Sequence, residues 1–216
     1  MQMNKDIQMS DAGQQAYCQC PCYVQPGCEL YNEDCGITLS RLNGIDIVIT
    51  DPPYPNFHKE IFFYKDGLID FLNELKCKQL IFWTAKEPFP LDFTAIHKWH
   101  KQTGTYATIE YIYERNGGTE EKTYSYQKIK NKIDAQMNRD VLTGHPSQKP
   151  IRLMKHLIKD FTKKGDTVFD PFTGSGSTGV ACLKYQRKFI GSELNKEYFD
   201  LSVKRLESVR SQPELF

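Results

Sequence analysis

The chain has 216 residues, of which 39% are hydrophobic and 25% charged, so it can bury the core of one domain without disulfide or metal staples. Its formal net charge of +1 excludes a uniformly basic surface, so any contact with nucleic acid must use a local basic region. No run approaches the roughly 18 apolar residues of a membrane span, and the first residues resemble no secretory signal. We expect a cytoplasmic protein without a membrane partner.

Several of the seven cysteines gather near the start of the chain, at Cys18, Cys20, Cys22 and Cys28. Four thiolates can bind zinc, but C-x-C-x-C is not the usual C-x2-C spacing, and no second cysteine pair or nearby histidine completes a site. A zinc site and a row of reduced cysteines on an extended segment both remain open, and our predicted site includes no metal. We expect residues 1–27 to form a Cys-containing, partly disordered extension.

The first half of the chain alternates between continuous apolar runs, typical of strands buried on both faces, and stretches of near-helical period. In chain order we expect a strand at Ile45–Thr50, a helix at His58–Leu75, a strand at Gln79–Thr84, a helix at Leu91–Lys101 and a strand at Ala107–Glu114. Two prolines directly after the first strand end its ladder, because proline has no N–H to donate.

Residues 115–144 are polar and lack a clear period, and regular alternation resumes after them. There we expect a helix at Ile151–Lys163, a strand at Thr167–Asp170, a Gly-rich turn, a helix to about Tyr185, a strand at Lys188–Ser192 and a helix at Lys196–Val209. Strands that alternate with helices predict an α/β fold, a Rossmann-like doubly wound and mostly parallel sheet with helices on both faces.

The Gly-rich turn after the strand at 167–170 reads G-x-G-x-x-G from Gly174 to Gly179. Glu193 follows the next strand, where a carboxylate can accept both hydroxyls of a ribose. The pattern predicts an adenosine-type cofactor, which NAD and S-adenosylmethionine both satisfy. Only about 40 residues follow Gly176, too few for a second dinucleotide half. This order favours a circularly permuted sheet with one mononucleotide-like cofactor.

The tetrapeptide Asp51-Pro52-Pro53-Tyr54 follows the first predicted strand. An exocyclic amine is a poor nucleophile, and acceptors such as the Asp51 carboxylate and the Pro52 carbonyl can take its two N–H groups and turn its lone pair toward an electrophile. The prolines hold the carbonyls rigidly, and Tyr54 can stack on a base withdrawn from the duplex. The bare tetrapeptide is also compatible with a simple turn.

Together these segments resemble the DNA amino-methyltransferases that act on adenine N6 or cytosine N4. Residues 51–54 resemble their catalytic motif, 169–176 their cofactor motif, 145–150 the segment that holds the methionine part of the cofactor, and 32–35 a loop that contacts its adenine. The catalytic motif precedes the Gly-rich motif, as in the family's β group. The resemblance covers about residues 28–208.

The resemblance implies S-adenosylmethionine as the cofactor and assigns a role to each motif residue. The implied residues that grip the target base are Asp51, Pro52, Pro53 and Tyr54. The implied cofactor-binding residues are Asp34, Cys35, His145, Ser147, Lys149, Asp170, Phe172, Gly174, Gly176 and Glu193. Among these, Asp34 reaches the adenine amine, Glu193 takes the ribose, and Lys149 pairs with the cofactor's carboxylate. Ser147 departs from the family pattern, where threonine is usual.

The implied reaction is direct in-line methyl transfer to N6 of a flipped adenine in DNA, without metal or a cysteine nucleophile. Cys35, Cys77 and Cys182 are therefore expected to be structural. Adenine is favoured because the family's cytosine enzymes more often carry serine at the position of Asp51. Methylation of cytosine N4, methylation of adenine N6 in RNA and a non-catalytic DNA-binding module remain alternatives, while chain order disfavours an NAD-dependent oxidoreductase.

Two further segments suggest how partners are held. We expect a catalytic domain over 28–210 with a short target-recognition segment at 115–144, whose basic residues interleave with Tyr124 and Tyr126 and hold DNA phosphates. A solvated loop is the alternative. Within the tail at 211–216, Gln212–Phe216 resembles the peptide by which bacterial DNA enzymes dock into the replication sliding clamp, or else is a frayed end. The expected host is a bacterium, phage or mobile element.

Overall fold

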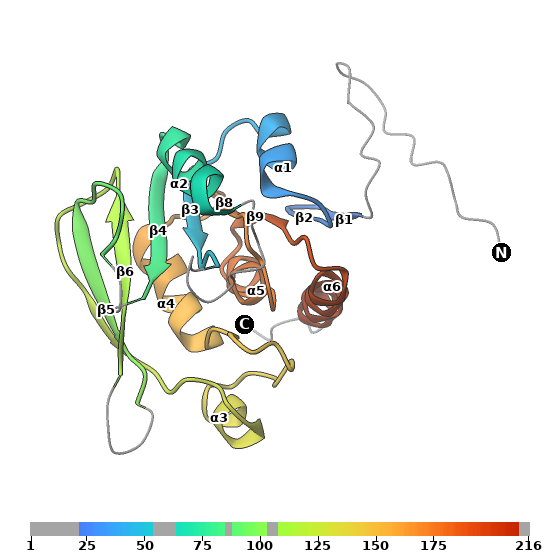
Figure 1. Ribbon diagram of the computed structural model, residues 1–216. Coiled ribbons are helices and arrows are strands. Elements are labelled where there is room, and N and C mark those ends of the chain that lie inside the picture. Colours follow the sequence, from blue (N-terminus) through green and yellow to red (C-terminus); the bar gives the residue numbers. More distant parts are fainter. Residues whose placement is uncertain (1–21, 54–63, 85–87, 103–107, 212–216) are drawn as a thin grey trace.

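The computed structural model describes residues 22–53, 64–84, 88–102 and 108–211 (Figure 1). Its strands form one sheet in the order β1-β2-β9-β8-β3-β4-β6-β5-β7. The strands are β1 (Cys22–Gln25), β2 (Cys28–Tyr31), β3 (Ile47–Thr50), β4 (Lys78–Trp83), β5 (Ala95–His100), β6 (Ile109–Arg115), β7 (Thr123–Ser125), β8 (Thr167–Asp170) and β9 (Lys188–Ser192). The helices are α1 (Cys35–Arg41), α2 (Tyr64–Glu74), α3 (Lys132–Met137), α4 (Ile151–Phe161), α5 (Ser177–Lys184) and α6 (Lys196–Arg210).

The centre of the sheet is parallel, from β2 through β9, β8 and β3 to β4. Helices α4, α5 and α6 pack on one face, and α1 and α2 pack on the other (Figure 1). The apolar run Ile47-Val48-Ile49 in β3 is fully buried because both of its faces are covered. The predicted doubly wound α/β class is therefore confirmed.

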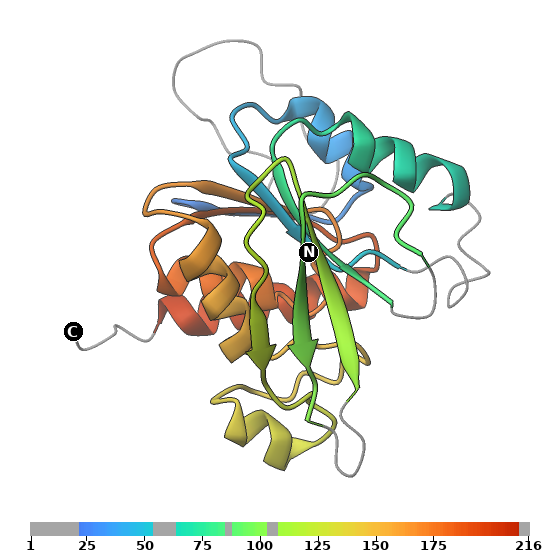
Figure 2. The ribbon, with the colours of Figure 1, turned by 90° about the vertical axis from the view of Figure 1, so that its left-hand side faces the viewer.

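Beyond β4 the sheet becomes antiparallel, because β6 runs against both β4 and β5. Figure 2 turns this part of the sheet toward the viewer, with α3 lying beyond the lower end of the strands. Strand β7 then pairs with β5 in parallel. Both β7 and α3 fall within the stretch 115–144, for which the sequence predicted no regular structure.

The helix predicted at Leu91–Lys101 is wrong, since this stretch contains strand β5. Its side chains alternate between buried and half-buried positions, as a strand requires. One of the buried positions holds His97, which is fully buried and whose Nε2 lies 3.1 Å from Oε2 of Glu114 in β6. Because a polar pair occupies core positions, the apolar period of two is hidden in the sequence.

The predicted strands at 45–50, 79–84, 167–170 and 188–192 are confirmed to within two residues. The sequence did not predict the hairpin of β1 and β2, whose turn places Gly27 at φ 72°. The sheet thus begins at Cys22, inside the stretch predicted as an extension. Part of the helix predicted at His58–Leu75, namely 58–63, lies outside the described residues.

Several cysteines of the described residues are buried as thiols. These are Cys28, Cys35 and Cys182, and burial raises the pKa of Cys28 and of Cys35 to about 12. Within the described ranges no group of three or more His, Cys, Asp or Glu side chains is placed to hold a metal ion. Cys18 and Cys20 lie outside those ranges.

No helix in the described part of the chain is long and apolar enough to cross a bilayer.

Candidate active site at the carboxyl ends of the parallel strands

The candidate site lies where three neighbouring parallel strands end. Asp51 follows β3, the Gly-rich turn follows β8, and Glu193 follows β9. Since β3, β8 and β9 are consecutive in the sheet, these groups share one edge, the lower one in Figure 1. Ligands of open α/β sheets bind at this edge, because loops and helix N-termini there leave a crevice between the strand ends.

Asp51 belongs to a row of alternating charges, the charge row, formed by Lys101, Glu110, Lys149 and Asp51. Lys149 Nζ donates a hydrogen bond to Oδ2 of Asp51 and lies 3.3 Å from Oε1 of Glu110. Oε2 of Glu110 pairs with Lys101. The Lys149 ammonium also lies 4.9 Å from the centroid of the Phe82 ring, which adds a cation–π contact.

Lys149 and Glu110, the two central members of the charge row, favour their charged forms although they are largely buried. Burial opposes the charge of Lys149, but Asp51 and Glu110 outweigh it and raise the pKa of the ammonium. Burial likewise opposes ionisation of Glu110, but Lys149 and Lys101 outweigh it and lower the pKa of that carboxyl. Each charge thus depends on its neighbours, and removing one unbalances the rest.

The Gly-rich turn forms a cradle that glycine alone fits. Gly174 and Gly176 have φ values of 54° and 76°, in the left-handed region that other residues rarely adopt. A Cβ on Gly174 would lie 3.1 Å from Nε2 of His145, and one on Gly176 would lie 3.0 Å from Oγ of Ser202. The backbone of the turn therefore packs directly against His145 and α6.

Glu193 ties the turn to the end of β9. Its Oε2 accepts the N–H of Gly174 at 2.8 Å, and its Oε1 accepts the N–H of Asn195 at 2.8 Å. Burial raises the pKa of the Glu193 carboxyl, while these two backbone N–H groups act in the opposite direction. Each carboxylate oxygen has further lone-pair capacity, so the group can still accept the two hydroxyls of a ribose.

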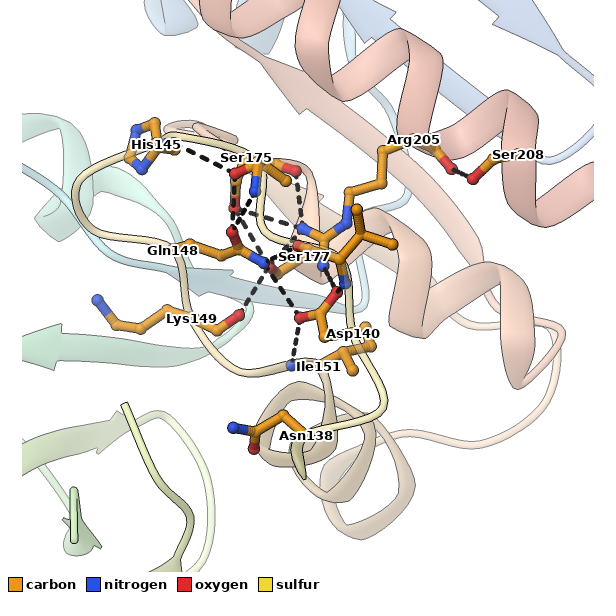
Figure 3. Close-up of polar contacts among 12 residues, drawn as sticks. Asn138, Asp140, His145, Gln148, Lys149, Ile151, Ser175, Ser177, Arg205 and Ser208 are labelled. Atoms are coloured by element: carbon orange, nitrogen blue, oxygen red, sulfur yellow. Dashed lines mark hydrogen bonds and ion pairs between the residues drawn. The ribbon is translucent and has the colours of Figure 1, made fainter. Parts of the chain in front are cut away.

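A buried network fixes the segment 145–150 against the Gly-rich turn (Figure 3). Arg205 of α6 pairs with Oδ1 of Asp140 and donates 2.9 Å hydrogen bonds to Ser175 O and to Oγ of Ser177. Oδ2 of Asp140 accepts the N–H of Ile151 at 3.1 Å. We call these residues, with Gln148, the Arg205–Asp140 network.

The network also decides how Lys149 is presented. Ser177 Oγ donates a 2.8 Å hydrogen bond to the carbonyl of Lys149. Gln148 donates to Val141 O at 2.8 Å and to Asp140 Oδ2 at 3.2 Å. Figure 3 shows the Lys149 carbonyl facing Ser177 while its ammonium points away from Arg205. The backbone held by the cradle thereby delivers the ammonium to the charge row.

His145 contacts both the turn and α6. Its Nδ1 accepts the N–H of Ser147 at 3.2 Å, and its ring lies edge-on to Tyr198 with centroids 4.3 Å apart. Burial and the neighbouring charge of Lys149 lower the pKa of the imidazole to about 4. A neutral imidazole is therefore expected at pH 7, with Nδ1 as an acceptor.

Asp170 is a buried carboxylate at the end of β8 that connects β3, which precedes Asp51, with α5, which follows the Gly-rich turn. It is 3% exposed and accepts hydrogen bonds from Thr50 at 2.9 Å, Thr178 at 2.6 Å and the N–H of Phe172 at 3.2 Å. Burial raises the pKa of this carboxyl to about 6, although the three donors act in the opposite direction. Asp170 therefore connects β3, β8 and α5 in the core.

The family model for N6/N4 DNA methylases, described as DNA methylase, matches residues 56–204, which is more than half of the chain. The chain belongs to the N6/N4 DNA methylase family. This agrees with the resemblance drawn from its four motifs.

The curated relatives to which the chain is similar include bacterial methyltransferases. The chain is 40% identical over 97 residues to the type II methyltransferase M2.DpnII of Streptococcus pneumoniae, covering 39% of this chain and 36% of the relative. It is 38% identical over 88 residues to the DNA adenine methyltransferase YhdJ of Escherichia coli, covering 39% and 30%. The chain thus matches about a third of the length of each of these relatives.

Solved structures share the fold of this chain. The M1.HpyAVI–SAM complex matches with a TM-score of 0.59 at 24% identity, covering 83% of this chain and 98% of that one. The cytosine-N4-specific PvuII DNA methyltransferase matches with a TM-score of 0.63 at 15% identity, covering 88% of both chains. These likenesses confirm the predicted fold class.

The structure brings several of the predicted site residues together. Asp51 meets Lys149, while Gly174 meets Glu193 and His145. The predicted partner of Lys149 was the cofactor's carboxylate, whereas in the structure it pairs with Asp51 and Glu110. The cofactor contact of Lys149 stays a prediction.

Other predicted site residues have structural contacts or lie outside the described ranges. Asp34 caps α1 by accepting the N–H of Gly36 at 2.8 Å, and Cys35 is buried in the first turn of that helix. Pro52 is buried and Pro53 is half-buried. Tyr54 lies outside the described residues, so its stacking stays a prediction.

Two side chains of the predicted phosphate-binding segment, Arg115 and Tyr124, are buried in the structure. Arg115 is 7% exposed and donates to Asp92 O at 2.7 Å and to Leu72 O at 2.9 Å, so its guanidinium holds the antiparallel strands to α2. Tyr124 is also buried and donates to Asp160 at 2.9 Å. Neither side chain is available to DNA, and phosphate binding by the neighbouring lysines stays a prediction.

Sequence reasoning missed Glu110, Asp140 and Arg205. The sign that points to Glu110 is a charged residue at an inward position of an otherwise alternating strand, because buried charges need partners. Arg205 lies beside Leu206 on the buried side of α6, where a solvated arginine is not expected. Asp140 has no such sign, because it lies in a segment without a period.

Proposed function

We propose that this chain is a site-specific DNA methyltransferase that transfers a methyl group from S-adenosylmethionine to N6 of adenine. The observation that carries the proposal is the position of Asp51. Its carboxylate ends β3 beside the strand that leads into the Gly-rich turn, and Lys149 holds it in place. A carboxylate acceptor, Asp51, is therefore fixed near the Gly-rich turn that we assign to the cofactor.

The residues present fit S-adenosylmethionine. Glu193 offers two carboxylate oxygens to the ribose hydroxyls, and the backbone of Gly174 and Gly176 forms the wall against which the cofactor packs. Asp34 and His145 line the two ends of the proposed pocket, for the adenine and the methionine part. When bound, the cofactor supplies a methyl group made electrophilic by a positively charged sulfur. The M1.HpyAVI–SAM complex, which shares the fold, supports this assignment.

The proposed chemistry is positioning and charge placement around a flipped base. Asp51 and the carbonyl of Pro52 accept the two N–H groups of the target amine, so its lone pair faces the methyl carbon. Bound S-adenosylmethionine would supply the methyl carbon: the N–C bond would form as the C–S bond breaks, the electron pair of that bond would stay on sulfur, and the amine would then lose one proton to water. Asp51 stabilises the positive charge that develops on nitrogen.

Adenine is proposed over cytosine on two grounds. The family's cytosine enzymes more often carry serine where this chain has Asp51, and one curated relative is named a DNA adenine methyltransferase. The cytosine-N4-specific PvuII enzyme shares the fold at 15% identity, so cytosine N4 is the second candidate. RNA adenine methylation and a DNA-binding module without catalysis are further outcomes of the test below.

The proposed function also requires residues that bind the DNA backbone. We assign phosphate contacts to the lysines of residues 115–144, which form the proposed target-recognition segment.

The segment proposed to dock into the sliding clamp, Gln212–Phe216, lies outside the described residues. The proposal is tested by deleting this segment and measuring binding to a purified sliding clamp. Unchanged binding would remove the clamp from the proposal.

The central test is methyl transfer from labelled S-adenosylmethionine to mixed genomic DNA, followed by nucleoside mass spectrometry. We expect N6-methyladenine from the wild-type chain and a loss of about a hundredfold or more in Asp51→Asn, which keeps the shape of the side chain but removes its charge. Asp200→Asn, the same change at a half-exposed ion pair on α6, serves as the matched control and should keep full activity.

Each other outcome of this test has a defined meaning. N4-methylcytosine would keep the mechanism and change the base. No methylated DNA nucleoside would overturn the DNA proposal, and the same assay with RNA would then separate an RNA enzyme from a binding module. Thermal stabilisation by S-adenosylhomocysteine but not by NAD would support the cofactor independently of activity.

A further inference from the structure

We propose that Glu110 is a positioning residue for methyl transfer, because it receives the Lys149 ammonium when Asp51 accepts the target amine. This inference rests on the proposed function. It is carried by one juxtaposition, in which a largely buried ammonium lies between the buried carboxylate of Glu110 and the half-buried carboxylate of Asp51, which must be released for the reaction.

The two carboxylates share Lys149 unequally. Lys149 Nζ donates a hydrogen bond to Asp51, whereas its 3.3 Å contact with Oε1 of Glu110 is an ion pair without hydrogen-bond geometry. Among the described residues no donor hydrogen-bonds to that buried oxygen. A buried acceptor without a donor is unfavourable, so a small movement of Nζ toward Glu110 gains a hydrogen bond.

The reaction creates the need for that movement. Asp51 must accept an N–H of the target amine, and Lys149 competes for the same carboxylate. Lys149 cannot leave for water, because its side chain is 11% exposed. With Glu110 beside it, the ammonium can change partner without losing its counter-ion. The change of partner thus frees Asp51 at little cost.

Lys101 keeps the receiving carboxylate in place. It pairs with the other oxygen of Glu110, so Oε1 remains directed at Lys149. Lys128 adds a further positive charge nearby, and burial together with the charges of Lys101 and Lys149 lowers its pKa. The imidazole of His145, neutral at pH 7, offers Lys149 no negative charge. Among the described residues, Asp51 and Glu110 are the two carboxylates that form ion pairs with Lys149, so Glu110 is the partner to which the ammonium can move.

The test compares Glu110→Gln with a matched control on the same strand. Glu114 is also a buried carboxylate of β6, but it pairs with His97 and accepts the N–H of Gly118 at 2.8 Å, away from Lys149. Single-turnover methyl transfer is measured for the wild type, Glu110→Gln and Glu114→Gln, together with KM for S-adenosylmethionine and the unfolding midpoint of each variant.

We expect Glu110→Gln to slow the methyl-transfer step by about tenfold or more while KM for S-adenosylmethionine changes by less than about threefold. Glu114→Gln should lose stability without this selective loss of rate. An equal loss of rate in both variants, or no loss in Glu110→Gln, overturns the inference. If the wild type itself methylates nothing, the proposed function fails, and with it the inference.

A second variant separates partner exchange from simple charge balance. Glu110→Gln leaves Lys101 without its counter-ion, and Lys101→Met in the same chain removes that excess charge and protects the fold. If Glu110 acts by receiving Lys149, the double variant stays slow. If the double variant regains the wild-type rate, Glu110 serves only as the counter-ion of Lys101, and the inference is wrong.

Discussion

The cofactor side and the target side of the site are built on different principles. On the cofactor side, the Gly-rich turn and the segment 145–150 are held by backbone hydrogen bonds, packed glycines and the Arg205–Asp140 network. On the target side, Asp51 is held by side-chain charges at the end of β3. A backbone mould keeps one shape, whereas long charged side chains can exchange partners without a change of fold.

This contrast fits the two tasks of the proposed enzyme. A cofactor that is the same in every turnover is best served by a rigid surface, because little ordering is needed on binding. The target amine arrives with a base that must leave the duplex, and its acceptor must change partners during the reaction. The three predictions below break or sharpen the contrast, from the largest expected effect to the smallest.

The largest effect is expected from Arg205→Met, which removes the centre of the cofactor side. Asp140 would be left buried without its cation, and the free energy of unfolding should fall by about 3–5 kcal/mol in urea denaturation. S-adenosylhomocysteine should also bind more weakly. Lys196→Met breaks an exposed ion pair on the same helix and should cost about 1 kcal/mol or less. Equal losses would show that the network is not buried in solution.

A pH series tests Asp170, which lies on the seam between the two sides. Its pKa is raised to about 6 in the fold from 3.8, so the folded state binds the proton more tightly between these values. This stabilisation is complete below pH 3.8 and is lost as the pH rises through 6. From pH 4 to 7, the wild type should lose up to about 3 kcal/mol relative to Asp170→Asn.

The comparison with Asp170→Asn isolates this carboxyl, since His145 titrates in the opposite direction in both proteins. The pKa of His145 is lowered to about 4, so its contribution is present above pH 6.5 and lost as the pH falls toward 4. Urea denaturation at four pH values gives the difference between the two proteins. A difference that stays constant with pH would show that Asp170 titrates normally.

The smallest effect contrasts one glycine on each face of the sheet. A Cβ on Gly179 in α5 would lie 2.8 Å from the Phe189 ring, so Gly179→Ala should destabilise the protein by about 1–3 kcal/mol. A Cβ on Gly67 in α2 meets no atom within 4 Å, so Gly67→Ala should stabilise it by about 0.5–1 kcal/mol. Both are measured by urea denaturation, and a loss of stability in Gly67→Ala would contradict this account of α2.

How much the sequence predicts differs between the two sides for a physical reason. The strand at Lys188–Ser192 was predicted with its observed bounds, because its buried apolar centre, Phe189 and Ile190, lies between polar ends. The Gly-rich turn and Glu193 were also predicted, since they lie close together along the chain. These two cofactor-side features can thus be predicted from local sequence, whereas the Arg205–Asp140 pair, which joins distant parts of the chain, was missed.

The target side depends on pairings between distant segments. Glu110 reaches Lys149 only because β6 runs antiparallel beside β4, and nothing local predicts that pairing. The same region contains the incorrectly predicted helix, where the His97–Glu114 pair replaces an apolar contact in the core. Local patterns do not reveal that two polar residues satisfy each other across neighbouring strands.

The reversal of direction at β6 also affects how this fold can diversify. Because β5 ends and β6 begins at the same end of the sheet as Asp51, a sequence grafted between His100 and Ile109 would leave the sheet at that end. Lengthening a loop costs only about 0.6 kcal/mol per doubling of its length. Further elements can therefore be inserted there while the parallel strands around the Gly-rich turn stay as they are.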